Sequence, residues 1–120
     1  MLYLYNMSIE PDAEQDADDR LFKALGSRTR RALLDLLKDR ARTTGDLCKQ
    51  FPELDRCTVM QHLKVLEDAQ LVVAIRRGRE RWNHLDVLPI AALQERWLGQ
   101  YAAPSASRLN RLKRQLEAAD

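Results

Sequence analysis

The sequence predicts a mainly helical fold that contains one small β-hairpin, within the α+β class. Two observations lead to this prediction. From residue 16 onward, most apolar residues recur at the spacing of an amphipathic helix. Between residues 71 and 85 the spacing changes, and the segments LVVAI and RWNHL have the composition and alternation of two strands. The length of 120 residues suits one domain.

The first two predicted helices are joined by a short link. Leu21, Phe22 and Leu25 form an apolar stripe that stops at Gly26, a residue type that commonly ends helices. Ser27 can cap the second helix, because its hydroxyl can accept a hydrogen bond from a backbone N–H of the first turn. The apolar side of that helix is predicted to consist of Ala32, Leu33, Leu36 and Leu37.

A short third helix is predicted next. Thr43 or Thr44 caps it and Pro52 ends it. Leu47 and Phe51 are four residues apart and therefore face inward together.

The fourth predicted helix contains the segment CTVMQHLKVL (57–66), with Asp55 as its cap. At about 100° per residue, its core side consists of Val59, Leu63 and Leu66. The side opposite this core stripe carries little charge at its N-terminal end, whereas a face that only meets solvent usually carries more Glu and Lys. We therefore predict that this side makes contacts. It carries Cys57, Gln61, Lys64 and Asp68, with Thr58, Met60 and His62 on its flanks.

The β-hairpin is predicted to have two strands, 71–75 and 81–85, joined by the turn RRGR (76–79) around Gly78. Helix returns after Asp86, and Pro104 is predicted to interrupt or kink it. Two apolar stripes follow from this pattern, one of Ile90, Leu93, Trp97 and Tyr101 and a later one of Leu109, Leu112 and Leu116.

This order of elements is that of a winged helix-turn-helix, in which the second helix of the pair enters the major groove of DNA. Gln suits the edge of adenine, Lys suits guanine acceptors, and Met or Cys can pack on a thymine methyl. The arginines of the hairpin are expected on phosphates or in the minor groove. The predicted DNA-binding residues are Arg56, Cys57, Thr58, Met60, Gln61, His62, Lys64, Arg76, Arg77 and Arg79.

The charge distribution leads to the same class of partner. Residues 1–19 carry a net charge of −6, whereas residues 20–120 carry +8. A basic body behind an acidic tail indicates a polyanion partner, the alternative being a solvated surface with an acidic leader. No signal peptide or membrane-spanning stretch is evident, so we expect a cytoplasmic protein with free thiols and no membrane contact.

The segments LFKALGSRTRRALLDLL and QHLKVLEDAQLV, the latter leading into an Arg/Gly-rich hairpin, resemble ArsR/SmtB-type transcriptional repressors over about residues 20–101. The resemblance implies a homodimer, paired through its first and last helices, that leaves its operator when an effector arrives. It also implies DNA contacts at Arg56, Cys57, Met60 and Gln61. Cys57 and Met60 depart from the family, because two of these positions usually hold small hydroxyl residues. The predicted dimer contacts are Leu21, Phe22, Leu93, Trp97, Tyr101, Leu109, Leu112 and Leu116.

Many members of this family sense metals, but this chain resembles a branch that lacks the Cys-x-Cys motif. The two thiolate positions of that motif fall on Thr43 and Gly45, and only Cys48 nearby is a thiol. No histidine follows His84 for the other known site, so we predict no metal and no cofactor. Plain packing is the favoured role of Cys48 and Cys57, and redox sensing by the more exposed Cys57 is the alternative.

The sequence therefore predicts a sequence-specific DNA-binding regulator that binds a palindromic operator as a homodimer. The resemblance implies that it acts as a repressor. The alternative is a non-catalytic winged-helix module for protein–protein contact. An enzyme is excluded, because no catalytic constellation or phosphate-binding loop occurs. A small effector is unidentified. The predicted organisation is a disordered acidic tail at 1–15, the winged helix-turn-helix domain at 16–103 and a helical extension at 104–120 that contacts the partner subunit.

Overall fold

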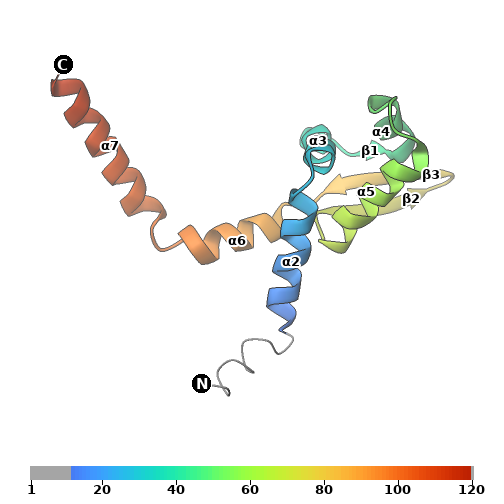
Figure 1. The fold of residues 1–120 in the computed structure, drawn as a ribbon, viewed down its shortest axis with the longest axis horizontal. Coiled ribbons are helices and arrows are strands. Elements are labelled where there is room, and N and C mark those ends of the chain that lie inside the picture. Colours follow the sequence, from blue (N-terminus) through green and yellow to red (C-terminus); the bar gives the residue numbers. More distant parts are fainter. Residues whose placement is uncertain (1–11, 120) are drawn as a thin grey trace. The chain divides into compact units, whose positions relative to one another are not determined.

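The computed structural model describes residues 12–119, without the side chains of 102–107 and 119. Most of the predicted acidic tail, residues 1–11, lies outside the described residues. The chain divides into two compact units, Met1–Pro89 and Ile90–Asp120 (Figure 1). In chain order the elements are α2 (Ala13–Leu25), α3 (Arg28–Leu37), β1 (Arg42–Thr43), α4 (Thr44–Gln50), α5 (Arg56–Asp68), β2 (Val72–Arg77), β3 (Glu80–Leu85), α6 (Leu88–Leu98) and α7 (Ala102–Ala119).

Helix α2 begins earlier than its apolar pattern predicts. The helix starts at Ala13, whereas the helical periodicity was evident only from Asp16. The Asp12 side chain accepts a hydrogen bond from the backbone N–H of Glu14 at 2.9 Å and so caps the helix. A solvated first turn needs a cap but no apolar stripe, and periodicity therefore cannot locate it. The predicted end of the helix at Gly26 is confirmed.

Helix α3 begins after Ser27, whose hydroxyl accepts from the backbone N–H of Arg30 at 3.3 Å, as predicted. Its core side differs from the prediction, because Leu34 is buried with Leu33 and Leu37 while Leu36 is only half-buried. Helix α3 packs against α2, α5 and β3, so its buried face is wider than one stripe and is turned toward Leu34.

The sheet has three strands rather than the predicted two. Strand β1 pairs with β3, giving the antiparallel order β1-β3-β2, and places Arg42 opposite Asn83 and Thr43 opposite Trp82. A strand of two residues carries no alternation, so the sequence pattern could not reveal it. Strand β2 begins at Val72 rather than Leu71, but both strands run further toward the turn than predicted, so that the turn shrinks to Gly78 and Arg79.

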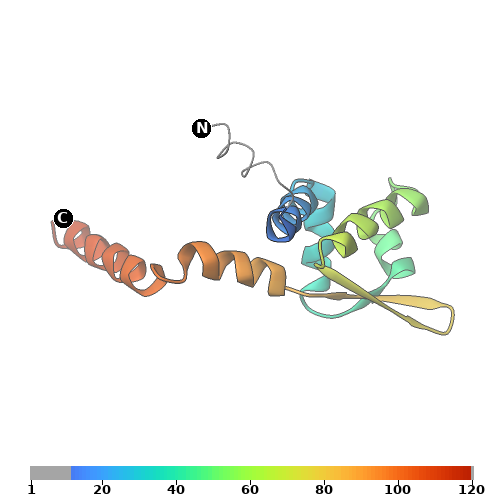
Figure 2. The same ribbon diagram turned by 90° about the horizontal axis from the view of Figure 1, so that it is seen from below.

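The core of the first unit lies between the helices and one face of the sheet. In Figure 2 the helices α2–α5 lie on the same side of the hairpin, which forms an extended two-stranded arm. The fully buried leucines come from α3, α4, α5 and the start of the hairpin, which ties these elements together. They are Leu33, Leu47, Leu63, Leu66 and Leu71, each 0% exposed.

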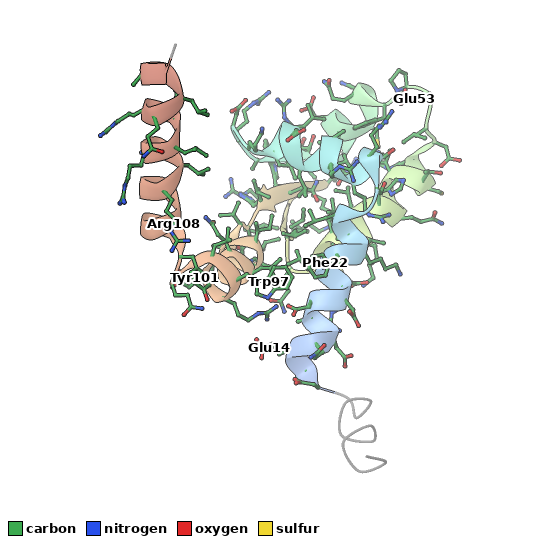
Figure 3. The ribbon with its side chains drawn as sticks, turned by 60° about the vertical axis from the view of Figure 1, so that its left-hand side comes forward. Glu14, Phe22, Glu53, Trp97, Tyr101 and Arg108 are labelled. Atoms are coloured by element: carbon green, nitrogen blue, oxygen red, sulfur yellow. The ribbon has the colours of Figure 1, made fainter. Side chains whose placement is uncertain are left out.

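The second unit is built differently, because helix α6 contains no buried residue. The chain leaves helical geometry between Leu98 and Ala102, so Tyr101 lies in the connection rather than on α6 (Figure 3). The break therefore precedes Pro104, contrary to our prediction. Pro104 lies in the first turn of α7, where a missing backbone N–H costs no helical hydrogen bond.

Candidate nucleic-acid interface

Helix α5 is held by its cap and by its apolar stripe. The Asp55 carboxylate accepts a hydrogen bond from the backbone N–H of Thr58 at 2.7 Å, and this bond lowers the pKa of Asp55. Val59, Leu63 and Leu66 are at most 1% exposed, which confirms the predicted core side. The rotation of the helix about its axis is fixed by this stripe, and the identity of the outward face follows from it.

The outward face of α5 contains the side chains that the sequence singled out. Arg56, Cys57, Gln61 and Lys64 are exposed. Thr58, Met60 and His62 are half-buried at the flanks. Lys64 forms an exposed ion pair with Asp68, with Nζ 3.2 Å from Oδ1. An exposed pair of this kind contributes little to stability. The Lys64 ammonium can therefore leave Asp68 for an anion that binds it more strongly.

His62 has a contact that sequence reasoning missed. Its Nδ1 lies 3.2 Å from Nη1 of Arg30 on α3. The same guanidinium donates from Nε to the backbone carbonyl of Ala24 at 2.9 Å and from Nη2 to that of Lys23 at 2.7 Å. Partial burial, and next the charge of Arg30, lower the pKa of His62. One arginine therefore joins the end of α2 to the middle of α5.

The hairpin presents its basic side chains unevenly. Arg76, Arg77 and Arg79 are exposed. Arg76 and Arg77 are strand residues opposite Arg81 and Glu80, rather than turn residues as predicted. Gly78 has φ +63°, a conformation that glycine adopts without steric cost, and this allows the tight turn. The Arg81 guanidinium is ion-paired with Glu67 at the end of α5, so it fastens the wing to the helix.

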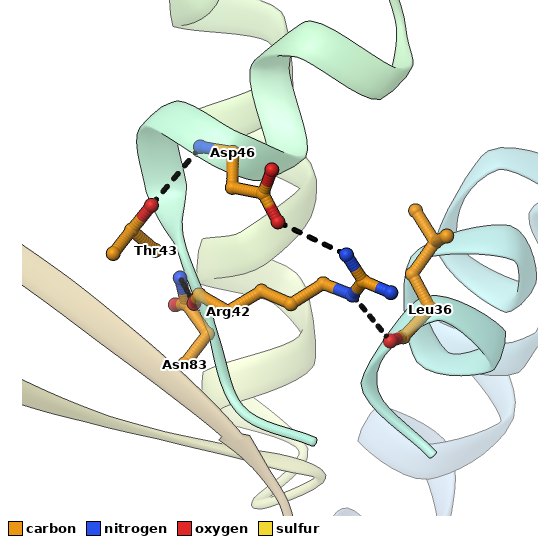
Figure 4. Close-up of polar contacts among 5 residues, drawn as sticks. All are labelled: Leu36, Arg42, Thr43, Asp46 and Asn83. Carbon is orange, nitrogen blue, oxygen red and sulfur yellow. Dashed lines mark hydrogen bonds and ion pairs between the residues drawn. The ribbon is translucent and has the colours of Figure 1, made fainter. Parts of the chain in front are cut away.

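A buried polar contact joins the hairpin to the helix-turn-helix (Figure 4). Asn83 is 0% exposed, and its Nδ2 donates to the carbonyl of Arg42 at 3.2 Å. The same Nδ2 donates to Oγ1 of Thr44 at 3.1 Å. The Arg42 guanidinium donates to the carbonyl of Leu36 and to Asp46 Oδ2, 3.0 Å away. The root of the wing is thereby fixed beside the start of α4. The only sequence signal for Asn83 was a polar residue inside a strand.

Cys48 is half-buried and Cys57 is exposed, and both are free thiols. In the part of the chain that the structure describes, no three His, Cys, Asp or Glu side chains gather where they could hold a metal ion. No helix among the described residues is long and apolar enough to cross a bilayer.

A helix with an exposed polar face, beside a basic hairpin and on a helix-turn-helix core, defines a winged helix-turn-helix DNA-binding protein. Comparison with known proteins identifies the same class. A family model for a helix-turn-helix domain matches residues 25–74. An HTH-type transcriptional regulator of Bacillus subtilis, YuzN, is 36% identical over 86 residues, which are 67% of this chain and 94% of the relative.

Two further similarities refine the class. The transcriptional repressor SdpR of Bacillus subtilis is 34% identical over 61 residues, covering 51% of this chain and 67% of SdpR. The crystal structure of an ArsR family transcriptional regulator matches 78% of this chain and 94% of its own, with a TM-score of 0.65 and 29% identity. The chain belongs to the ArsR/SmtB-type winged helix-turn-helix transcriptional regulators. These proteins bind DNA and are not enzymes.

Proposed function

We propose that the protein is a cytoplasmic repressor that binds a palindromic operator as a homodimer, with α5 in the major groove and the wing on the flanking backbone. The observation that carries this proposal is the outward face of α5. Cys57 and Gln61 are exposed there, directly opposite the buried Val59 and Leu63. A recognition helix needs a fixed rotation and side chains whose donors and acceptors match base edges. The buried stripe fixes the rotation, and the Gln61 amide presents both a donor and an acceptor on the exposed face.

The remaining DNA contacts divide by chemistry. Cys57 and Met60 are suited to apolar contact with thymine methyl groups, and Lys64 to guanine acceptors. Arg56, Thr58 and His62 lie at the start and flank of the face, where the phosphate backbone passes a helix in the groove. Arg76, Arg77 and Arg79 are exposed on the wing and bind phosphate there.

The homodimer is supported by the apolar surface of α2 and of the second unit. Phe22 is 45% exposed on α2, and Leu109, Leu112 and Leu116 are 67%, 51% and 62% exposed on α7. Exposed apolar surface of this kind marks interfaces. Leu21, in contrast, is buried in the core of its own unit and has little surface to offer a partner. The extension 104–120 is included in the interface, which is composed of Phe22, Leu93, Trp97, Tyr101, Leu109, Leu112 and Leu116, with Leu21 as support beneath.

Repression is proposed from SdpR, which is named as a transcriptional repressor. A homodimer matches an operator with two half-sites about one helical turn, ~34 Å, apart. Release by a small effector completes the proposed cycle. Zinc, cadmium and arsenite are not expected to act as that effector, since Thr43 and Gly45 cannot supply thiolates.

The test measures binding of the full chain to the DNA upstream of its own gene, by fluorescence anisotropy with random duplex as competitor. We expect tight, competitor-resistant binding of two chains per site. Leu112→Asp should give a monomer by light scattering and lose most operator affinity, while the matched variant Gln115→Asp on the same helix should stay dimeric. Binding that random duplex removes completely would contradict a specific operator. No binding to either DNA at low salt would favour the winged-helix module for protein contact.

A further inference from the structure

The Arg30–His62 contact determines which form of the imidazole is present. An arginine side chain stays protonated in proteins and has only donors. The Arg30 Nη1 therefore donates, and His62 Nδ1, 3.2 Å away, must accept. An Nδ1 that accepts carries no proton, so the ring is neutral and its proton is on Nε2.

The other side of the ring is available for a ligand. Nε2 has no hydrogen-bond partner among the described residues and is not one of their buried, unpartnered polar atoms. His62 is one position beyond Gln61, on the flank of the outward face of α5. A flank position in a major-groove helix faces the sugar–phosphate backbone.

We propose that Arg30 is a positioning residue for DNA binding, which holds His62 as the neutral Nε2–H tautomer so that this N–H donates to a phosphate oxygen of the DNA backbone. The proposal rests on α5 being the recognition helix. Arg30 is itself fixed by two carbonyls at the end of α2, at 2.9 Å and 2.7 Å, and therefore sets the ring direction from a rigid base. Partial burial of the ring, and next the charge of the Arg30 guanidinium, oppose protonation and lower the pKa of His62.

A neutral donor leaves a specific signature. It displaces no counterion, so its removal lowers affinity without changing the slope of log affinity against log salt. A protonated histidine on the same phosphate would make that slope steeper and would make binding tighter as pH falls. Besides Arg30, the charged groups on this side of α5 include Asp55 and Arg56 at its start, and Lys64 and Asp68, which are paired with each other at 3.2 Å.

The first experiment needs no DNA. Long-range ¹H–¹⁵N spectra of the imidazoles in the full chain near neutral pH should show His62 with an unprotonated Nδ1 and a protonated Nε2. An Nδ1–H tautomer or a charged ring would overturn the proposal, while leaving the proposed function intact.

The second experiment uses variants of matched shape. In His62→Asn the amide lies about where Nδ1 lies, so it can still accept from Arg30 but has no donor for DNA. In His62→Gln the amide lies about where Nε2 lies, so the donor remains. We expect His62→Asn to weaken binding to operator and random duplex by about three- to tenfold, as for one hydrogen bond, with an unchanged salt slope. His62→Gln should weaken it less.

Arg30 is tested through its dependence on His62. Arg30→Lys should weaken binding in the wild-type background and should have no further effect when combined with His62→Asn. Equal losses in both backgrounds would mean that Arg30 acts only on the fold. If His62→Asn binds as tightly as wild type while Gln61→Ala loses its operator preference, the proposed function stands and the role of His62 is wrong.

Discussion

Helix α5 and the wing, the two elements proposed to bind DNA, are supported very differently within the fold. Helix α5 has a buried apolar stripe, a cap at Asp55 and an imidazole, that of His62, in contact with Arg30. On the wing, Val73 and Ile75 are 46% and 43% exposed, and three arginines are exposed. The helix proposed to read bases is thus held in one position, whereas the arm proposed to bind phosphate has little packed beneath it.

This difference follows from what each contact requires. Base edges are distinguished by donors and acceptors at fixed positions, so a side chain such as Gln61 must be presented by a rigid element. Phosphates attract any nearby cation over several ångströms, so Arg77 needs reach more than rigidity. We therefore expect changes in the helix to alter stability and specificity, and changes in the wing to alter overall affinity.

The largest expected effect separates the two regions by stability. Leu63→Ala removes a side chain that is 0% exposed and should lower the free energy of unfolding by about 2–5 kcal/mol. The matched change Ile75→Ala on the wing should cost less than about 1 kcal/mol, because the side chain is already half in water. Urea unfolding followed by circular dichroism measures both. Equal losses would show that the wing is supported as firmly as the helix.

The next effect concerns specificity. Gln61→Ala should lose about 1–3 kcal/mol of binding free energy on the cognate operator, because one bidentate contact to a base edge disappears. It should lose little on random duplex. The control is Gln94→Ala, an exposed glutamine on α6. A uniform loss on both DNAs would contradict base reading by Gln61.

The wing is expected to behave in the opposite way. Arg77→Ala should weaken operator and random duplex alike and flatten the plot of log affinity against log salt by roughly one unit per subunit. Arg108→Ala, at an exposed arginine of α7, is the control. A change in base preference at constant slope would instead assign Arg77 to base reading.

The smallest effect is a dependence of stability on pH. The pKa of His62 is lowered in the folded chain, so the unfolded chain binds a proton more readily. Stability is therefore fully present above the ordinary histidine pKa and decreases as pH falls through it toward the lowered value. Asp55 acts in the same direction in a more acidic range, since its pKa is also lowered. Thermal unfolding of wild type and His62→Asn at several pH values isolates the contribution of His62 to this pH dependence. Identical pH profiles of the two proteins would refute that contribution.

The sequence was informative where a pattern repeats. The stripe of Val59, Leu63 and Leu66 recurs every three or four residues, so the rotation of α5 and the exposure of Gln61 could be predicted. The caps Ser27 and Asp55 could be predicted for the related reason that each acts on its own first turn.

Contacts between distant residues could not be predicted in this way. Arg30 and His62 are 32 positions apart, and Asn83 and Thr44 are 39 apart. Nothing local distinguishes Arg30 from Arg28 or Arg31 beside it. Strand β1 exists because Asn83 and Trp82 offer it an edge, and its two residues carry no strand pattern of their own. The proposed DNA and dimer contacts stay predictions, because each depends on a second molecule.

The junction between α5 and β2 has a mechanical consequence. Gln70 has φ 61°, the backbone N–H of Leu71 donates to the carbonyl of Leu66 at 2.9 Å, and the Leu71 side chain is fully buried. Helix α5 and strand β2 are thus joined by a rigid connection, and the Arg81–Glu67 ion pair links the neighbouring strand β3 to the end of α5. We expect α5 and the hairpin to move together as one rigid body. An effector that tilts α5 would move the wing with it, and both proposed DNA contacts would then be lost in a single step.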